Sequence, residues 1–273
     1  MKLVRMTELL QDAYAKKYAI AQFNINNLEW IKSILLVSQK NRSPVILGVS
    51  GGTVTHMCGF KTIHDVTVGV ADYLNIDVPV VLHLDHGKTK EACIQAIDAG
   101  FSSVMFDGSH LPFEENLKLT QEIVQYAHAK GVSVEAELGT IAGSEDGIVN
   151  SHVIYADPEQ CDIMVKETQI DCLAPALGST HGLYKGKAKL GFDEMQHISK
   201  LVKIPLVLHG GTGISDEDML HAIELGVAKI NVNTEFMYAW CRSRTPIQAK
   251  IRTRHQRPTK SDHQWLKRSG KIN

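Results

Sequence analysis

Hydrophobic residues before residue 240 fall into two patterns that alternate along the chain. Short runs rich in Val, Ile and Leu are each followed by a longer stretch with apolar residues three or four positions apart. The first pattern predicts a buried strand and the second an amphipathic helix, so their alternation indicates parallel βαβ units. The predicted strands span residues 19–24, 45–49, 80–84, 103–106, 133–137, 172–177, 206–209 and 229–233, and the predicted helices span 28–39, 62–74, 90–99, 113–129, 158–168, 192–201 and 216–225.

This count of strands favours an α/β fold of the (β/α)8 TIM barrel type, whose usual length is roughly 250 residues. A doubly wound open sheet is the alternative, but residues 24–27 after the first strand do not form the glycine-rich turn expected there. We therefore predict a single barrel domain over residues 1–240. The polar, glycine-rich connection at residues 139–155 follows the fifth strand, and we predict that it is a mobile lid on the catalytic face.

Charge is distributed unevenly over the 273 residues. The chain has 29 basic and 30 acidic residues, but residues 241–273 hold ten Lys and Arg against one Asp, a net charge of +9. Residues 1–240 therefore carry a net charge of −10, which makes nucleic acid a poor partner for the barrel.

Cysteine usage and the N-terminal segment indicate the compartment. The five cysteines are odd in number and none are two or three positions apart, which argues against a disulfide framework and favours a reducing compartment. The first 18 residues lack the apolar core of a signal peptide, and no segment approaches the ~18 apolar residues of a membrane span. We expect a soluble, cytoplasmic protein without a membrane partner.

Polar residues gather where the predicted strands end, which is where a barrel of this type keeps its chemistry. The third strand ends in His83, Asp85 and His86, the sixth runs into a turn that contains His181, and the seventh ends at His209. Neutral imidazoles from separate rigid elements suit a catalytic Zn²⁺ with an open position for substrate. The spacing leaves open whether His83 or His86 is the ligand from the third strand.

Glycine-rich turns follow the seventh and eighth strands, at residues 210–213 and 231–234. Their backbone N–H groups can hold an anion, and these loops are the usual phosphate site of the barrel. A metal beside a phosphate pocket suggests polarisation of a carbonyl, with a carboxylate to move protons. Asp85 is the candidate for that carboxylate, and its alternative role is to support a ligand histidine.

Six runs of residues closely resemble the class II, zinc-dependent fructose-bisphosphate aldolases, in the shorter bacterial branch that includes tagatose-bisphosphate aldolases. They are QFNINNLE at 22–29, SPVILGVS at 43–50, HLDHG at 83–87, VEAELG at 134–139, APALGSTHG at 174–182 and LHGGTG at 208–213. The resemblance covers residues 1 to 240 in order.

The resemblance implies roles for individual residues. His86, His181 and His209 correspond to the zinc ligands, Asp85 to the acid/base at the C4 hydroxyl, and Glu145 to the glutamate that transfers a proton at C3. Carboxylates that can hold a second or displaced metal position correspond to Asp107 and Glu137. The site for the dihydroxyacetone phosphate half, with Na⁺ or K⁺ bound nearby, corresponds to Gly182, Gly210, Gly211, Thr212, Asn231, Val232, Asn233 and Thr234, and further substrate contacts to Asn24 and Ser50.

The implied reaction is the reversible aldol cleavage of fructose 1,6-bisphosphate, a sugar bisphosphate of glycolysis, to dihydroxyacetone phosphate and glyceraldehyde 3-phosphate, with zinc stabilising the enediolate. The implied assembly is a homodimer or homotetramer. Tagatose bisphosphate is the alternative substrate. A Schiff-base aldolase is a further alternative, but it needs a lysine at the catalytic face. Lys229 is predicted at the start of the eighth strand, away from that face.

The resemblance stops after Trp240. Residues 241–273 lack helical periodicity and match neither the eighth barrel helix nor the arginine that reaches the C6 phosphate in the family. We predict that this basic tail is frameshifted or disordered, so that the eighth helix is in doubt and the outer faces of the first and last strands lose cover. The alternative to an active enzyme is therefore a homologue impaired in folding, dimerisation or C6-phosphate binding.

Overall fold

A computed structural model describes residues 2–145, 148–150, 154–182, 184 and 186–242. The chain divides into two compact units, residues 1–233 and residues 234–273, which we describe separately. In the second unit, residues 234–242 are helical.

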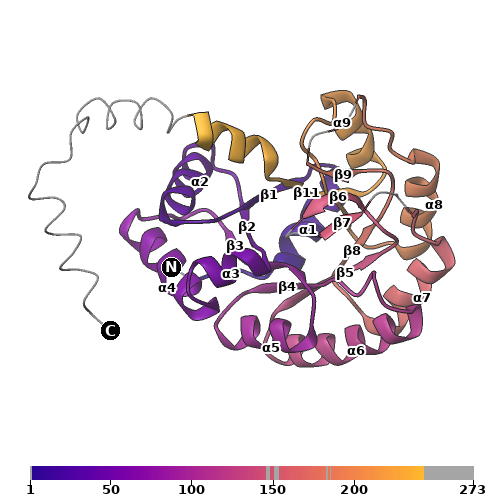
Figure 1. The fold of residues 1–273 in the computed structure, drawn as a ribbon, viewed down its shortest axis with the longest axis horizontal. Coiled ribbons are helices and arrows are strands. Elements are labelled where there is room, and N and C mark those ends of the chain that lie inside the picture. The colour runs from indigo at the N-terminus through magenta and orange to yellow at the C-terminus, as the bar shows by residue number, and fades with distance from the viewer. Residues whose placement is uncertain (1, 146–147, 151–153, 183, 185, 243–273) are drawn as a thin grey trace, which may run out of the picture. The chain divides into compact units, whose positions relative to one another are not determined.

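The first unit contains a closed barrel of eight parallel strands (Figure 1). The last strand pairs with the first, Gln22 opposite Asn231, and so closes the ring. This confirms the predicted TIM barrel, and each predicted strand overlaps an observed one. The strands are β1 (Ile20–Asn24), β2 (Val45–Val49), β3 (Val80–Gly87), β4 (Ser103–Phe106), β5 (Ser133–Leu138), β8 (Cys172–Pro175), β10 (Leu206–Leu208) and β11 (Val227–Val232).

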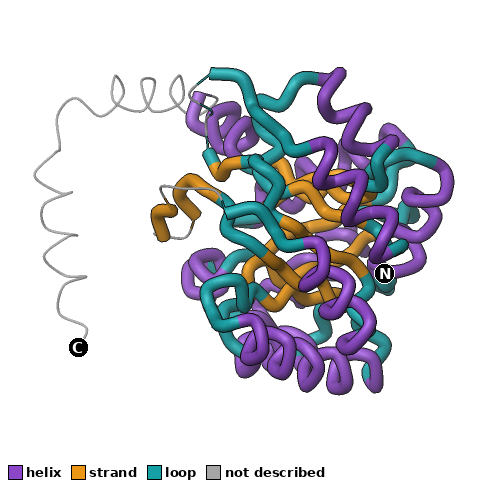
Figure 2. Tube along the Cα trace, turned by 90° about the vertical axis from the view of Figure 1, so that its right-hand side faces the viewer, coloured by secondary structure: helices purple, strands orange, loops and turns teal. Residues whose placement is uncertain are grey.

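Helices surround the barrel strands, as Figure 2 shows with helices in purple and strands in orange. The helices predicted over residues 113–129 and 158–168 have those bounds in the structure, whereas α1 and α3 were not predicted. The helices of the first unit are α1 (Met6–Lys16), α2 (Leu28–Asn41), α3 (Gly51–His56), α4 (Phe60–Tyr73), α5 (Lys90–Asp98), α6 (Phe113–Ala129), α7 (Pro158–Thr168), α8 (Phe192–Val202) and α9 (Asp216–Glu224). In the described part of the chain, no helix has both the length and the apolar character that crossing a bilayer requires.

Short polar side chains define where several helices begin. Asn27, Thr89, Asp157 and Ser215 each accept a hydrogen bond from the backbone N–H three residues further on, at 2.9, 3.1, 2.9 and 3.2 Å. Each bond satisfies one of the N–H groups that the first helical turn leaves unpaired. At the other end, Gly226 follows α9 with φ of 116°, a conformation that glycine adopts at little cost.

The connection after β5 contains a hairpin that the sequence patterns did not predict. Strand β6 (Ala142–Glu145) pairs antiparallel with β7 (Ile148–Asn150), and β9 (Thr180–His181) pairs parallel with β6. In Figure 2 the hairpin stands away from the barrel strands. The glycine-rich, acidic composition concealed it because neither strand shows a run of apolar residues. Mobility of this connection stays a prediction.

Helix α1 packs against the residues with which the barrel strands begin. Met6, Leu10 and Ala13 are fully buried in an apolar cluster. The cluster also contains Ile20, Ile46, Val81, Cys172, Ala174, Val207 and Ala228. Apolar packing is therefore concentrated at the N-terminal end of the barrel, and polar side chains are left for the opposite end.

Hydrogen bonds at Asp171 hold α1 in this position. The hydroxyl of Thr7 donates to Asp171 Oδ1 at 2.6 Å, and the backbone N–H of Thr7 donates to Ser133 Oγ at 3.1 Å. The other carboxylate oxygen of Asp171 accepts the backbone N–H of Val134 at 2.7 Å and lies 2.9 Å from His128 Nε2. One carboxylate thus ties α1 to the start of β5.

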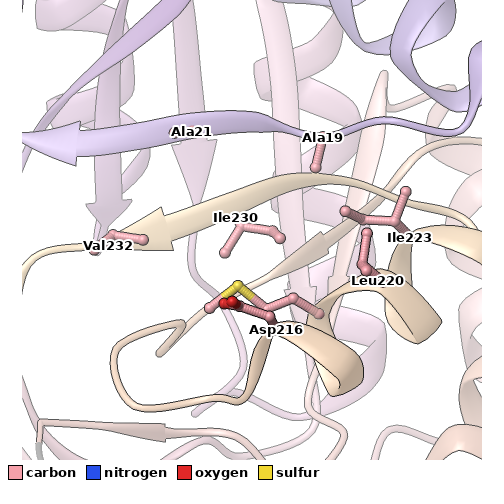
Figure 3. Close-up of a pocket in the computed structure, with 8 residues that line it drawn as sticks. Ala19, Ala21, Asp216, Leu220, Ile223, Ile230 and Val232 are labelled. Carbon is pink, nitrogen blue, oxygen red and sulfur yellow. The ribbon is translucent and has the colours of Figure 1, made fainter.

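An apolar pocket of about 450 Å³ lies on the outside of the barrel, against β1 and β11. Ala19 and Ala21 line it from the β1 side, Ile230 and Val232 from β11, and α9 forms another wall (Figure 3). These are the outer faces of the first and last barrel strands, for which the sequence raised the question of a covering helix. The predicted division at residue 240 and the predicted character of the tail stay predictions, and residues 243–273 lie outside the described residues.

Replacement of Thr7 by Val tests the attachment of α1. The substitution keeps the shape of the side chain but removes the hydroxyl that donates to Asp171, so we expect the free energy of unfolding to fall by about 1–3 kcal/mol. Urea unfolding measures it. The control is Thr55→Val, because the hydroxyl of Thr55 is exposed and makes only a 3.4 Å bond to Gly51 O. Equal midpoints for the two variants would contradict this role of Thr7.

Candidate metal centre

Three histidines from separate elements meet at the C-terminal mouth of the barrel. His86 comes from β3, His181 from β9, and His209 directly follows β10. One nitrogen from each lies within 4.8 Å of the others. His86 and His209 are buried and His181 is half-buried, which leaves one side of the group open. Three imidazoles with an open position match the ligand set of a catalytic metal ion.

The backbone at the end of β3 decides which of its two histidines takes part. His86 has φ of 50°, and the pairing of β3 with β4 shifts register between Leu84 and Gly87. This irregularity interrupts the alternation of the strand, so that Asp85 and His86 both reach the mouth. His83 lies deeper, with Nδ1 2.8 Å from Ser103 Oγ, and the choice that the spacing left open falls to His86.

Two carboxylates lie next to His86. Its Nε2 is 2.9 Å from His209 Nδ1, while its Nδ1 is 2.9 Å from Asp107 Oδ2 and 3.6 Å from Glu137 Oε2. His86, Asp107 and Glu137 form a second group whose ligand atoms lie within 4.8 Å of one another. The structure therefore brings together the residues predicted for a second metal position.

Asp107 is held in its charged form. Burial by itself raises the pKa of a carboxyl group, but the hydrogen bond with His86 and the charge of Lys88, which also contacts Asp107, hold the pKa of Asp107 well below its usual range. An anionic Asp107 can accept a hydrogen bond from the N–H of His86 Nδ1 and leave Nε2 free to bind a metal, or can itself bind one.

Asp85 is fixed beside the histidines by two amides. Asn24 Nδ2 donates to Asp85 Oδ2 and Asn231 Nδ2 donates to Asp85 Oδ1, both at 3.3 Å. The same Asn231 nitrogen lies 3.4 Å from His209 Nδ1. The predicted acid/base thus lies next to the predicted metal ligands, within reach of a substrate bound there.

A layer of polar side chains lies beneath the histidines, where a barrel of this type usually has branched apolar residues. Glu135 on β5 and Lys229 on β11 are fully buried and joined at 2.7 Å, and Glu135 also lies 2.9 Å from His209 Nε2. The prediction that Lys229 starts its strand is wrong, because β11 begins at Val227, and Lys229 points into the barrel. The sequence contained a signal for Glu135, since Ser133, Glu135 and Glu137 occupy alternate positions and so share one face of β5.

Burial controls the charge of the histidines in and below the site. It lowers the pKa of His83 to about 3, with a further contribution from Lys229. Burial also lowers the pKa of His209, although the hydrogen bond to Glu135 acts in the opposite direction. The lowered pKa favours the neutral form of His209, which is the form that binds a metal. For Glu135, burial acts to raise the pKa, but Lys229 and His209 outweigh it and the pKa falls below its usual range.

Comparison with known proteins assigns the chain to a family. The sequence model of the family described as fructose-bisphosphate aldolase class-II matches residues 4–271. The chain belongs to the class-II fructose-bisphosphate aldolases. Membership in this family makes the protein a lyase.

The names of proteins with similar sequences agree with this family. The chain is 57% identical to the fructose-bisphosphate aldolase of Geobacillus stearothermophilus over 250 residues, which cover 92% of this chain and 87% of the relative. It is also 57% identical to the fructose-bisphosphate aldolase of Staphylococcus aureus strain Mu50 over 235 residues, 86% of this chain and 82% of the relative.

Solved structures show the same architecture. The YdjI aldolase from Escherichia coli K12 superposes with a TM-score of 0.80 at 37% identity, covering 90% of this chain and 87% of that protein. Fructose-bisphosphate aldolase from Campylobacter jejuni gives a TM-score of 0.75 at 28% identity, covering 94% and 84%.

Within this aldolase, the turn after β10 is tightly constrained. Gly210 has φ of 65°, and a Cβ there would lie 2.3 Å from Thr180 O, so glycine is required. The backbone N–H of Gly211 donates to Asn231 O at 2.9 Å and is not available to an anion. Thr212 Oγ1, in contrast, is buried without a hydrogen-bond partner among the described residues, so its hydroxyl can bind a ligand.

Tyr184 connects two loops of the site and was missed by the sequence analysis. Its hydroxyl donates to Gly210 O at 3.0 Å and accepts the backbone N–H of Thr180 at 3.1 Å. A tyrosine in a loop has no periodic signal that would reveal such a contact. Tyr184 thus ties the strand that carries His181 to the turn that follows His209.

The remaining predicted residues lie in varied places. Gly182 follows β9 with φ of 98° and open space around it. Ser50 caps α3 at the end of β2. The side chain of Val232 lines the outer pocket of Figure 3, so only its backbone is available at the mouth.

Three further predicted residues lie on the hairpin and at the boundary between the two units. Glu145 ends β6 opposite Ile148. Asn233 ends the first unit and its Oδ1 is buried, whereas Thr234 begins the second unit, which is described by itself.

The histidine group can be tested by metal content. After incubation with zinc and gel filtration, we expect the unchanged protein to retain about one ion per chain and His86→Ala to retain far less, because two imidazoles remain of three. Mass spectrometry of the metal provides the measurement. His197→Ala is the control, since His197 is exposed on α8. Equal retention by both variants would rule out His86 as a ligand.

Proposed function

We propose that this aldolase cleaves fructose 1,6-bisphosphate reversibly to dihydroxyacetone phosphate and glyceraldehyde 3-phosphate with a zinc ion. The observation that carries the proposal is the convergence of His86, His181 and His209 beside the carboxylate of Asp85. The relatives named fructose-bisphosphate aldolase favour fructose over tagatose as the sugar.

The residues present fit zinc. Imidazole nitrogens are preferred zinc ligands, one side of the group is open, and buried carboxylates behind two of the rings can orient them. His86, His181 and His209 would hold the ion, and Asp107 with Glu137 would provide a second position around His86. Zinc would act there as a Lewis acid that polarises the substrate carbonyl.

The chain's own groups account for the proton transfers. Asp85 accepts the proton of the C4 hydroxyl as the C3–C4 bond breaks, and the amides of Asn24 and Asn231 keep its carboxylate aimed at the mouth. Glu145, on the β6–β7 hairpin, is the candidate for proton transfer at C3. The hairpin is joined to β9, so movement of the hairpin would be coupled to the strand that carries His181.

Phosphate binding falls to the loops after β9, β10 and β11. Thr212 offers its hydroxyl to the phosphate of the dihydroxyacetone phosphate half, and Gly182 allows close approach because nothing crowds its Cα. Asn24 on β1, the strand next to β11, and Ser50 after β2 provide further polar contacts. Na⁺ or K⁺ near these loops would offset the charge of the phosphate. A homodimer or homotetramer remains the expected assembly.

Metal removal tests the function. We expect cleavage of fructose 1,6-bisphosphate to be lost after EDTA treatment and restored by Zn²⁺, because the ligands lie in an open, preformed site. A coupled assay of glyceraldehyde 3-phosphate measures the rate of cleavage, and tagatose 1,6-bisphosphate is assayed in parallel. Full activity in EDTA, or covalent trapping of substrate by borohydride, would point to a Schiff-base lysine instead. The impaired-homologue alternative predicts zinc binding without cleavage.

The acid/base role of Asp85 predicts a loss of turnover without a loss of metal. Asp85 belongs to neither metal group of the described residues, so Asp85→Asn is expected to keep its zinc while kcat falls by about 10²–10⁴-fold. Steady-state kinetics on zinc-loaded protein provide the comparison. Asp77→Asn serves as the control, because Asp77 forms an exposed ion pair with Arg42. A kcat of Asp85→Asn within tenfold of that of the control would exclude the acid/base role of Asp85.

A further inference from the structure

The buried ion pair between Glu135 and Lys229 has no evident role in holding the fold. Both side chains are fully buried inside the barrel. Removing two charges from water costs several kcal/mol per ion, and a well-packed apolar pair is often at least as stable. The position of the pair, directly behind a histidine of the metal centre, suggests a role in that site.

The geometry connects the ion pair to one nitrogen of the His209 ring. Glu135 Oε1 lies 2.9 Å from His209 Nε2, and His209 Nδ1 lies 2.9 Å from His86 Nε2. Only one nitrogen of a neutral imidazole carries a proton. When Nε2–H donates a hydrogen bond to Glu135, the lone pair is on Nδ1, the nitrogen that faces His86.

Lys229 and its neighbours keep the carboxylate in this orientation. Lys229 Nζ donates to Glu135 Oε2 at 2.7 Å, so the two oxygens of Glu135 face different partners. Cys172 Sγ lies 3.8 Å from the same Oε2, and His83 Nε2 lies 3.6 Å from it. Rotation of the carboxylate would break the contact with Lys229, and the acceptor for His209 is therefore fixed.

We propose that Glu135 and Lys229 are positioning residues that fix the tautomer and orientation of His209, so that Nδ1 is presented to the metal ion. The inference rests on the proposed zinc site and adds two residues that bind neither metal nor substrate. Glu135 acts on His209 directly, and Lys229 acts through Glu135.

The test separates positioning from structural support. The double variant Glu135→Leu/Lys229→Met removes the acceptor without leaving a buried charge unpaired, so the apoprotein is expected to keep its urea midpoint. Its affinity for Zn²⁺, measured by competition with a chromophoric chelator, is expected to fall by about 10–100-fold. Glu135→Gln retains an oxygen that accepts from Nε2–H, so it is expected to lose less affinity than the double variant, about 3–10-fold.

Ser103→Ala is the matched control. It removes a buried hydrogen bond from the same layer, but that bond belongs to His83 rather than to His209. We expect its affinity for Zn²⁺ to equal that of the unchanged chain. An equal loss of affinity in Ser103→Ala and the double variant would overturn the proposal, because general loosening of the layer would then explain both.

The remaining outcomes distinguish this inference from the proposed function. If the unchanged chain binds zinc and both Glu135 variants bind it equally well, the positioning role is wrong and the zinc site stands. If the unchanged chain does not bind zinc at all, both the positioning role and the proposed zinc-dependent function fail. If the double variant does not fold, Glu135→Gln decides alone, and undiminished affinity in that variant overturns the proposal.

Discussion

The contact between the imidazoles of His86 and His209 is the interaction on which the site depends. The two residues are far apart in the sequence, yet His86 Nε2 and His209 Nδ1 lie 2.9 Å apart. Each ring has a carboxylate at its other nitrogen, Asp107 for His86 and Glu135 for His209. The rings are thus held from behind, and the two nitrogens in front are directed at one point that a metal ion can occupy.

The barrel separates stability from chemistry along its axis. At the N-terminal end, α1 closes the interior with Met6 and Leu10, and the hydrogen bonds at Asp171 keep the helix in place. At the C-terminal end, charged and polar side chains replace the apolar layers. Such groups are costly to bury unless they have partners, and Glu135 has partners in Lys229 and His209. The apolar end can therefore offset the cost of the polar end.

Most elements could be predicted from hydrophobic periodicity, because burial on one face leaves a regular trace in the sequence. The helices at 113–129 and 158–168 were predicted with their observed bounds. The hairpin of β6 and β7 was missed, since its residues show no apolar alternation. Lys229 was misplaced because a lysine in an apolar strand is normally read as a strand end, and only its partner on β5 explains its burial.

The sequence by itself determined the barrel, the strand ends at which polar residues collect, and, through its motifs, the resemblance to class II aldolases. These properties are local, since each depends on residues close together in the chain. The spacing left His83 and His86 open and the resemblance implied His86, but only the tertiary structure gave the physical reason, a register shift between β3 and β4. It also revealed Glu135, Lys229 and Tyr184 as parts of the site, because closure of the barrel brings strands from both halves of the chain around a single axis.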